Sequence, residues 1–483
     1  MKALLPTECA NDRLMVPETQ ILNPAVSQLS GLTVVQCLES ADDQLADTST
    51  GRFGEVDEPG WRSSDLIEDF NMAQPGTKRL PRNPGEVDPS FGTNGLIEIP
   101  EGDQIRAIME DNEALIYAVW RGRETWLYRV FKDGAADHSF GEQGLVKWSF
   151  ETGENASPEQ LIRQPDGKFL LIGRSINNGD PFLWRAAVSR FHPNGSPDLI
   201  FGTRILPYPY DPDKVHMVVP LPVATLQADG KLLLATGYRV LDTQGYSLRE
   251  AGRLYRFESD GASDMTFGIQ GQIEVRINGQ DTSIEGIGVL TDGSIIVSAT
   301  IDRADEGFSN TKMALACLKS NGALSQGFAV SGYWEAETPT QMPRISIKND
   351  QIMVMGIDLD EEGNYLWFSR LEANGQADPD FNNALPLLVQ LPFASSFAMV
   401  VLQSETRVIG LVTGYDGADW ACLVGVQDDG SLDLEYGAQG IATLGPGYLR
   451  SGALQQTAQR VIVAADMGDF PGKKVPTVIG VLN

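Results

Sequence analysis

Carboxylate side chains gather in the loops that follow the second apolar segment of a repeated pattern, and they are the first candidates for binding chemistry. Six of the seven loops carry them, whereas the remaining one reads WRGRETW and offers aromatic and basic side chains. Acidic groups on one rim would attract cations or basic partners, but charged loops can also be ordinary solvated surface. The residues singled out in these loops are Trp120, Arg121, Arg123, Asp302, Asp305, Glu306, Asp358, Asp360, Glu362, Asp416 and Asp419.

The segment DLDEEGN is similar to the start of a calcium-binding loop. Asp358, Asp360 and Glu362 place oxygen ligands at alternate positions before a glycine. The twelfth position of such a loop needs a bidentate glutamate, and here it is Ser369. We therefore predict no cofactor, and keep calcium at these three residues as the weaker alternative.

The longest insertion, YPYDPDKVHM, offers a different kind of contact. Tyr208, Tyr210 and Asp211 lie close together in it. Clustered aromatic and acidic side chains on a loop can stack on a sugar ring or hold a partner protein. They also suit a loop that packs on its own repeat, and both interpretations stay open.

The known catalytic motifs give an enzyme little support. The sequence contains three histidines, His138, His192 and His216, and the first two lie inside repeated turns. It contains no GxSxG, no HExxH and no glycine-rich phosphate loop. Catalysis would have to come from carboxylates that the fold brings together from different repeats.

The repeat itself is the clearest feature of the chain. A glycine, usually an aspartate three residues later, and an aromatic residue three further on return seven times, from GEVDPSFGTNG at Gly85 to GSLDLEYGAQG at Gly430. From Asp88 to Asp433 is 345 residues over six intervals, a period of about 57 that falls in the range of propeller blades. Between the copies, two apolar segments flank a DG-type turn, which is a hairpin signal.

Each repeat supplies four short strands, which we call a and b around the DG turn, c before the motif and d after it. Four antiparallel strands make one propeller blade. The array begins with a d strand at Leu96 and ends with a c strand at Asn483, so the chain ends complete one blade and remove the open sheet edges. We predict an all-β, seven-bladed β-propeller over residues 83–483 and an irregular acidic extension over residues 1–82.

The motifs DPSFGTNG, QPDGK and QADGK resemble the delta-60 repeat of bacterial proteins, and the strand order is similar to that of NHL-type propellers. Ser325 stands in place of the motif aspartate in one copy, and Asn382 in place of the following glycine in another. The resemblance implies a propeller and no established reaction, so function has to be argued from the loops.

Charge and composition exclude some classes of partner. The net charge is −28, with an isoelectric point near 4.4, which would repel nucleic acids and anionic membranes. The four cysteines have no metal-ligand spacing, and no apolar run approaches a membrane span. Without a Sec-type signal at the N-terminus, we expect a cytoplasmic protein or one exported by another route.

The leading functional prediction is a non-enzymatic scaffold that binds a protein or a glycan through its variable b–c and d–a loops on one propeller face. Loops that vary over a repeated frame are typical of contact surfaces. The alternative is a propeller hydrolase or lyase with a carboxylate or metal site at the ring axis. The oligomeric state is left open.

Overall fold

The computed structural model describes residues 83–112, 114–177, 184–207, 215–217, 221–241, 247–301, 311–359, 364–468 and 472–483. The regular structure of these residues is almost entirely β, with two single-turn 3-10 helices at Asn382–Ala384 and Gln456–Ala458. No helix in this part of the chain is long and apolar enough to cross a membrane. The extension predicted over residues 1–82 lies outside the described residues.

The strands form six antiparallel sheets, and each of the first five is built from strands that follow one another in the sequence. The first contains β2 (Gln104–Asp111), β3 (Ala114–Arg121), β4 (Glu124–Phe131) and β5 (Leu145–Trp148). The second contains β6 (Asn155–Arg163), β7 (Phe169–Ile176), β8 (Trp184–Phe191) and β9 (Thr203–Ile205). The third contains β10 (Val215–Met217), β11 (Val223–Leu226), β12 (Leu232–Leu241), β13 (Ser247–Phe257) and β14 (Gln272–Val275). The fourth contains β15 (Thr282–Val289), β16 (Ile295–Ile301), β17 (Lys312–Leu318) and β18 (Tyr333–Glu335). The fifth contains β19 (Thr340–Lys348), β20 (Gln351–Asp358), β21 (Tyr365–Leu371) and β22 (Leu387–Gln390).

The sixth sheet has seven strands and joins the two ends of the array. Its strands are β23 (Ser395–Gln403), β24 (Arg407–Tyr415), β25 (Asp419–Gln427), β26 (Ile441–Gln455), β27 (Arg460–Met467), β28 (Val475–Leu482) and β1 (Leu96–Glu98). Residues 441–446 of β26 pair with β25, whereas residues 447–455 pair with β27. The strand changes partner at a GPG segment in which Gly445 has a φ of +126°, a conformation that glycine tolerates because it lacks a Cβ. Divided there, the sheet is two four-stranded units.

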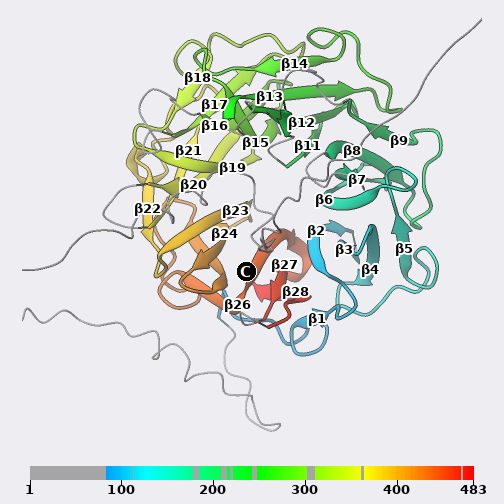
Figure 1. The fold of residues 1–483 in the computed structure, drawn as a ribbon. Helices are drawn as coiled ribbons and strands as arrows, with labels where there is room; N and C mark the ends of the chain where they lie inside the picture. The colour runs from blue at the N-terminus through cyan, green and yellow to red at the C-terminus, as the bar shows by residue number, and fades with distance from the viewer. Residues whose placement is uncertain are drawn as a thin grey trace, which may run out of the picture. The chain divides into compact units, whose positions relative to one another are not determined.

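The described strands therefore form seven units, which we number blades 1 to 7 from the β2 sheet onward. Six units have four strands, and in the third β10 and β11 both pair with β12. Figure 1 shows them following one another around a common axis, with β2, β6, β15, β19 and β23 innermost and β5, β9, β14, β18 and β22 outermost. The ring closes where β1 pairs with β28, Leu96 opposite Ile479. The predicted all-β propeller and its closure by the first d strand are confirmed.

The hydrophobic core lies between neighbouring blades. One cluster, for example, joins Leu233 and Leu254 of blade 3 to Ile284 and Val297 of blade 4. Another joins Ile105 of blade 1 to Ile462 of blade 7, across the point of closure. Each blade thus buries both faces of its sheet against its neighbours, as stacked repeats must to be stable.

The repeated aspartate organises its own turn and one buried ion pair. Asp264 accepts a hydrogen bond from the backbone N–H of Thr266 at 2.9 Å and from Nε of Arg256 at 2.7 Å. Lys231, from the DGK turn of the same blade, donates to it at 2.7 Å. These bonds to the charged form hold the pKa of Asp264 well below its usual range, although burial acts to raise it. The repeated aspartate therefore stabilises both its own turn and the neighbouring strands of its blade.

In blades 1, 2, 3 and 5 the arginine at the position of Arg256 also donates to a backbone oxygen of the following blade. The guanidinium of Arg370 lies 5.2 Å from the ring centroid of Phe381 and donates to the backbone oxygen of Asp428 in the following blade at 2.8 Å. The motif aromatics are almost completely buried; they are Phe91, Phe140, Phe201, Phe267, Phe328, Phe381 and Tyr436. These contacts give the repeated residues a structural role and leave the axis to be examined for chemistry.

Candidate active site at the propeller axis

The inner strands share an irregularity that places side chains toward the axis. In β2, β6, β15, β23 and β26 the register with the second strand of the blade slips by one residue, as in a β-bulge. A bulge leaves one residue out of the ladder and re-aims its side chain, and bulges often occur beside active sites. The residues left unpaired are Arg106, Glu159, Glu285, Met399 and Arg450.

The fifth blade has a longer irregularity at the equivalent place. The register of β19 jumps from Gln341 to Arg344. Between them, Met342 has a φ of +59°, the left-handed region that costs a residue with a Cβ about 1 kcal/mol or more. Such strain persists only where surrounding contacts enforce it, and Arg344 directly follows the strained segment.

Arg106 and Glu159 connect the first two blades. Glu159 is bound tightly within blade 2: its Oε1 lies 2.7 Å from Nε of Arg174 and 3.0 Å from Oγ of Ser157. Its Oε2 faces Nη1 of Arg106 at 3.7 Å. All three charged side chains are less than a tenth exposed, so the site contains more buried cation than buried anion.

Arg450 and Asp466 continue this arrangement into blade 7. Nε of Arg450 donates to Oδ2 of Asp466 at 2.9 Å, and the backbone N–H of Ile105 donates to Oδ1 at 2.9 Å. The Arg450 guanidinium lies 4.1 Å from the ring centroid of Tyr448. Asp466 is 2% exposed, and its contacts join blade 7 to the inner strand of blade 1.

Glu285 and Arg344 form the charged pair on the side of blades 4 and 5. Nη1 of Arg344 donates to Oε2 of Glu285 at 2.8 Å, and Nε donates to the backbone oxygen of Ala398 in blade 6 at 3.1 Å. Thr300 donates to Oε1 at 2.9 Å, while its oxygen accepts from the backbone N–H of Met342 at 3.2 Å. Burial nevertheless raises the pKa of Glu285, and the contacts with Arg344 and Thr300 only oppose that effect.

Tyr448 of blade 7 contacts both Arg450 and the inner strand of blade 6. Its side chain is nearly buried, and its hydroxyl is 3.9 Å from the sulfur of Met399. Burial raises the pKa of Tyr448, while the charges of Arg450, Arg106 and Arg344 lower it. Arg344 contacts Ala398, the residue before Met399, so both charged groups adjoin the same inner strand of blade 6. We call the following residues the axial cluster: Arg106, Glu159, Arg174, Glu285, Arg344, Tyr448, Arg450 and Asp466.

The axial cluster has the groups that acid and base catalysis needs. A carboxyl whose pKa is raised by burial keeps its proton to higher pH than a free carboxyl does, and burial raises the pKa of Glu285 in this way. Fixed arginines can stabilise negative charge that develops in a transition state. Within the described residues, no group of three or more His, Cys, Asp or Glu side chains could hold a metal ion. The carboxyl and the phenol of the axial cluster offer proton transfer to or from a substrate.

Three residues of the predicted acidic rim are described by the structure, and each has different contacts. Asp416 is exposed, whereas Asp419 pairs with Lys474, whose Nζ lies 5.9 Å from the Tyr448 ring centroid. Asp358 is buried and accepts from Oγ1 of Thr338 at 3.0 Å. Of these, only Asp419 adjoins the axial cluster.

In the WRGRETW loop of blade 1, arginine side chains lie against tryptophan rings. Arg121 lies 4.1 Å from the Trp126 ring centroid, and Arg123 is exposed. Trp120 is half-buried, and Arg106 lies 6.0 Å from its ring. The other predicted residues lie outside the described part of the chain, so calcium binding and the loop contacts stay predictions: Tyr208, Tyr210, Asp211, Asp302, Asp305, Glu306, Asp360 and Glu362.

Sequence reasoning missed the axial cluster, although a signal for part of it exists. Glu159 precedes the aspartate of its DG turn by seven residues, and Glu285 does the same in its own repeat. Counting back from each hairpin turn would have marked this position in both blades. The register slip that turns these side chains toward the axis has no comparable signature.

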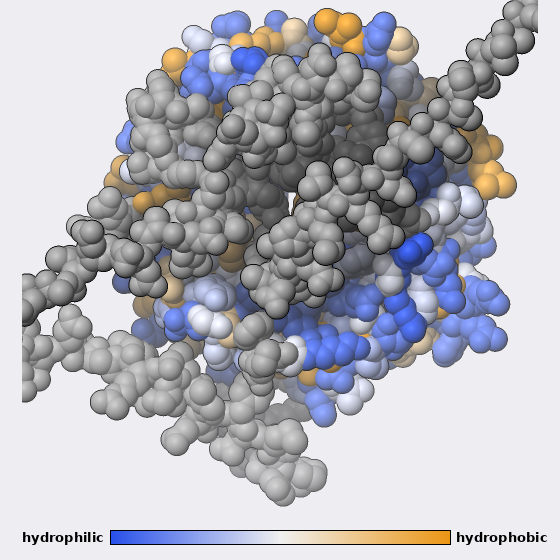
Figure 2. All heavy atoms as spheres, viewed as in Figure 1, coloured by the Kyte–Doolittle hydropathy of each residue, from blue (hydrophilic) through white to orange (hydrophobic). Residues whose placement is uncertain are grey.

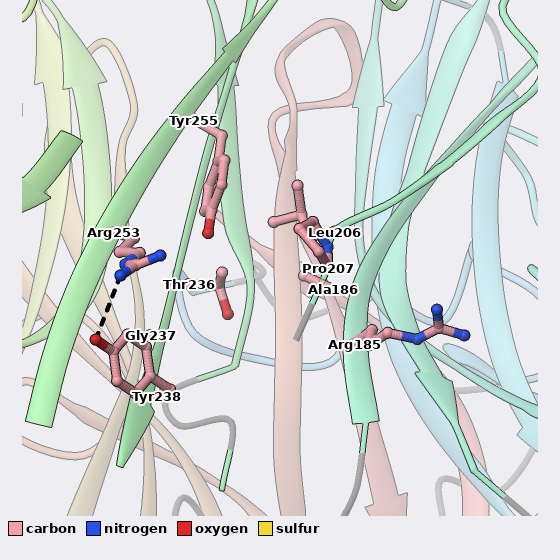
Figure 3. Close-up of a pocket in the computed structure, with 9 residues that line it drawn as sticks. All are labelled: Arg185, Ala186, Leu206, Pro207, Thr236, Gly237, Tyr238, Arg253 and Tyr255. Atoms are coloured by element: carbon pink, nitrogen blue, oxygen red, sulfur yellow. Dashed lines mark hydrogen bonds between the residues drawn. The ribbon is translucent and has the colours of Figure 1, made fainter. Parts of the chain in front are cut away.

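A small hollow lies between blades 2 and 3, away from the inner strands. Figure 3 shows Tyr238, Arg253, Tyr255 and Thr236 around it, with Arg253 donating to the Tyr238 hydroxyl at 3.3 Å. Its remaining lining comes from the outer half of blade 2, where Arg185 also pairs with Glu151. It is small and lacks the carboxyl groups that the axial cluster brings together, so the axial cluster is the better candidate.

Exposed apolar side chains also lie away from the axis. Most belong to the turns that lead into the outermost strands, and the most exposed are Leu199, Ile200, Ile269, Val330 and Leu434. Figure 2 shows apolar surface at the outer edge near β9, β14 and β22, and mostly hydrophilic surface over β2–β5. The chemistry-bearing residues and the exposed apolar residues are therefore separate features.

Comparison with known proteins places the chain only by its fold. No family model matches it, and no curated protein does. The polysaccharide lyase Uly1 is 10% identical, with a TM-score of 0.42, over 81% of this chain and 92% of that one. The Hadza microbial sialidase Hz136 is 11% identical, with a TM-score of 0.44, over 75% and 74% of the two chains. Drosophila Semaphorin 2a is 8% identical, with a TM-score of 0.44, over 84% and 77%.

These findings correct the prediction of a non-enzymatic binding scaffold. The similar structures include a polysaccharide lyase and a sialidase, which agrees better with the alternative, a propeller hydrolase or lyase. At such identities the likeness concerns the fold and does not carry an activity to this chain. The argument for an enzyme therefore rests on the buried charged groups that meet at the axis.

Proposed function

We propose that the chain is an enzyme that cleaves glycans, as a hydrolase or a lyase, with its reaction centre at the axial cluster. The observation that carries this proposal is Glu285, a carboxyl only 12% exposed whose pKa burial raises even though Arg344 touches it. A structural ion pair gains most from a fully ionised carboxylate, whereas a proton donor needs the opposite. Glycans are chosen as the substrate class because polysaccharide lyases and a sialidase are among the similar structures.

In this proposal Glu285 donates a proton to the oxygen of the bond that breaks. Arg344 and Thr300 hold both carboxyl oxygens and fix the orientation of the group. The arginines of blades 1 and 7 stabilise negative charge on the substrate or on the departing group. In a hydrolase, water then adds to the other fragment of the substrate. In a lyase, that fragment instead loses a proton and becomes unsaturated.

The test compares the wild type with Glu285→Gln on a panel of polysaccharides. Glutamine keeps the size and an oxygen acceptor for Arg344 but has no proton to donate, so we expect turnover to fall by a factor of about 10²–10⁴. New reducing ends report cleavage by either route, and ultraviolet absorbance of an unsaturated product reports elimination. Glu258→Gln is the control, because Glu258 pairs with Lys231 beside a hairpin turn of blade 3. Absence of turnover by the wild type, or full activity of Glu285→Gln, would refute the proposal.

Two finer assignments belong with this proposal. We also propose that the seven repeats are of the delta-60 class, on the motifs DPSFGTNG, QPDGK and QADGK. A cytoplasmic location, or export by a route other than Sec, remains our prediction for the cell. Detecting the protein in cell and culture fractions of its source would decide the latter.

A further inference from the structure

The axis is locally cationic in a chain that is strongly acidic overall. Lysines and arginines number 37 against 65 aspartates and glutamates. The axial cluster reverses this ratio: it contains four arginines and three carboxyl groups, and burial favours the neutral form of one of these, Glu285. Buried charges in proteins are normally matched by opposite charges, and a negative group from outside would balance the excess of cation in this cluster.

Arg450 is the arginine best placed to receive such a group. Its Nε is fixed by Asp466, and its guanidinium plane is held against the ring of Tyr448. Its two terminal nitrogens make no hydrogen bond to the described residues, and its side chain remains 14% exposed. A guanidinium fixed at one edge and open at the other presents two parallel donors, which match the two oxygens of a carboxylate or sulfate group.

The support behind Arg450 is already built. Asp466 is almost fully buried, and its second oxygen accepts from the backbone of Ile105, so the carboxylate cannot turn away from Arg450. The neighbouring Arg106 is 5% exposed, and burial lowers its pKa to about 10; the charges of Arg450 and Arg174 also lower this pKa, while those of Glu159 and Asp466 oppose them. An anion bound at Arg450 would relieve that repulsion between like charges.

We propose that Arg450 binds the carboxylate or sulfate group of an acidic sugar, so that the substrate of the axial site is an anionic glycan. The inference rests on the proposed function, since it names the substrate class of the same site. The acidic surface would oppose the approach of long polyanions, which favours short oligosaccharides or chain ends. Arg450 acts here as a binding residue, and Asp466 as its positioning residue.

Binding is measured by calorimetry without reference to turnover. The probes are oligogalacturonides, sulfated carrageenan oligosaccharides and neutral cello-oligosaccharides of equal length. We expect the wild type to bind at least one acidic series about 10-fold or more tightly than the neutral one. Carboxyl-reduced oligogalacturonides and desulfated carrageenan oligosaccharides identify which anionic group is recognised. Equal affinity for acidic and neutral probes, or no binding of either acidic series, would overturn the inference whatever the variants do.

The variants then locate the group in the protein. We expect Arg450→Gln to weaken binding of the acidic probe about 10- to 100-fold without affecting neutral probes, and Arg450→Lys to recover part of the loss. The control is Arg276→Gln, since Arg276 is 45% exposed and pairs with Glu274 and Asp281 away from the cluster. Folding of each variant is checked by its thermal midpoint. Unchanged acidic-probe affinity in a folded Arg450→Gln protein would refute the assignment.

The outcomes separate this inference from the proposed function. Turnover of neutral glycans alone would refute the anionic substrate while keeping the enzyme. Selective binding of acidic probes through Arg450 without cleavage of any glycan would support the anion site and refute the reaction.

Discussion

Replacing Asp264 by asparagine should destabilise the propeller, because it leaves a buried arginine without its counter-charge. The side chains of Asp264 and Arg256 are 1% and 7% exposed, and Nε of Arg256 lies 2.7 Å from Oδ2 of Asp264. Asparagine can still accept the backbone bond of Thr266, so the turn itself is kept. The change therefore isolates the loss of negative charge.

The size of the effect follows from burial. Removing one partner of a buried ion pair costs about 3–5 kcal/mol, because the remaining charge stays buried without compensation. Lys231 also loses a partner at 2.7 Å, but its side chain is 23% exposed and can turn toward water. We expect the free energy of unfolding to fall by about 3 kcal/mol or more.

Blade 4 supplies a matched comparison within the same chain. At the positions equivalent to Arg256 and Asp264 it has Cys317 and Ser325, so both charges are absent together. The double variant Arg256→Cys, Asp264→Ser removes both charges of the pair, so no buried arginine is left without its counter-charge. We expect this variant to be less destabilised than Asp264→Asn. Urea titration followed by tryptophan fluorescence measures all three proteins.

The control is Asp229→Asn, at an exposed DG turn of the same blade whose carboxylate bonds a backbone N–H. We expect it to change stability by less than about 0.5 kcal/mol. The reasoning would be refuted if Asp264→Asn unfolded at the wild-type urea concentration, or if the double variant were the least stable protein of the set.

Two further predictions concern protonation. Arg344→Met should raise the pKa of Glu285 further, since the positive charge of Arg344 opposes the effect of burial on this pKa. Carbon NMR titration of labelled glutamate measures the pKa, and the Glu285→Gln variant identifies the Glu285 signal. The control, Lys348→Met on the same strand, should leave the Glu285 pKa unchanged. A lower or unaltered Glu285 pKa would contradict this account. The pKa values of Asp198 and Asp264 are held well below the usual range in the folded chain, so the stability they contribute is present above about pH 4, the ordinary carboxyl pKa, and is lost as pH falls further. Urea midpoints between pH 7 and 2 should show this fall, and it should be shallower in Asp264→Asn; an equal slope would count against the assignment.

The fold could be predicted from the sequence because every blade repeats the same local signals. Glycine at the motif start, aspartate in the turn and a buried aromatic recur with little change, and hairpin turns mark the strand pairs between them. Closure also followed from the sequence, since the array begins with the d strand at Leu96 and ends with a c strand. Local turn chemistry and periodicity act over a few residues, which is the range that sequence patterns report.

The axial site could not be predicted in the same way. Its pairs join residues far apart in the chain, such as Ile105 with Asp466, 361 positions away. The register slips that turn Arg106 and Glu159 inward depend on how each inner strand packs against its neighbours. The sequence search for acidic loops found Asp419, which adjoins the cluster through Lys474, but it passed over the inner strands, where the charged residues stand among apolar ones.

The pattern of variation around the ring separates stability from chemistry. The motif aspartate and aromatic are kept in nearly every blade because each blade has the same turn to close and the same neighbour to contact. The bulge position of the inner strands is equally regular in backbone geometry, yet it is arginine in two blades, glutamate in two and methionine in one. A requirement of the repeat would select one residue type at this position, as it does for the motif. Different charges at equivalent positions instead build one asymmetric site, which is what a bound substrate of defined shape and charge requires.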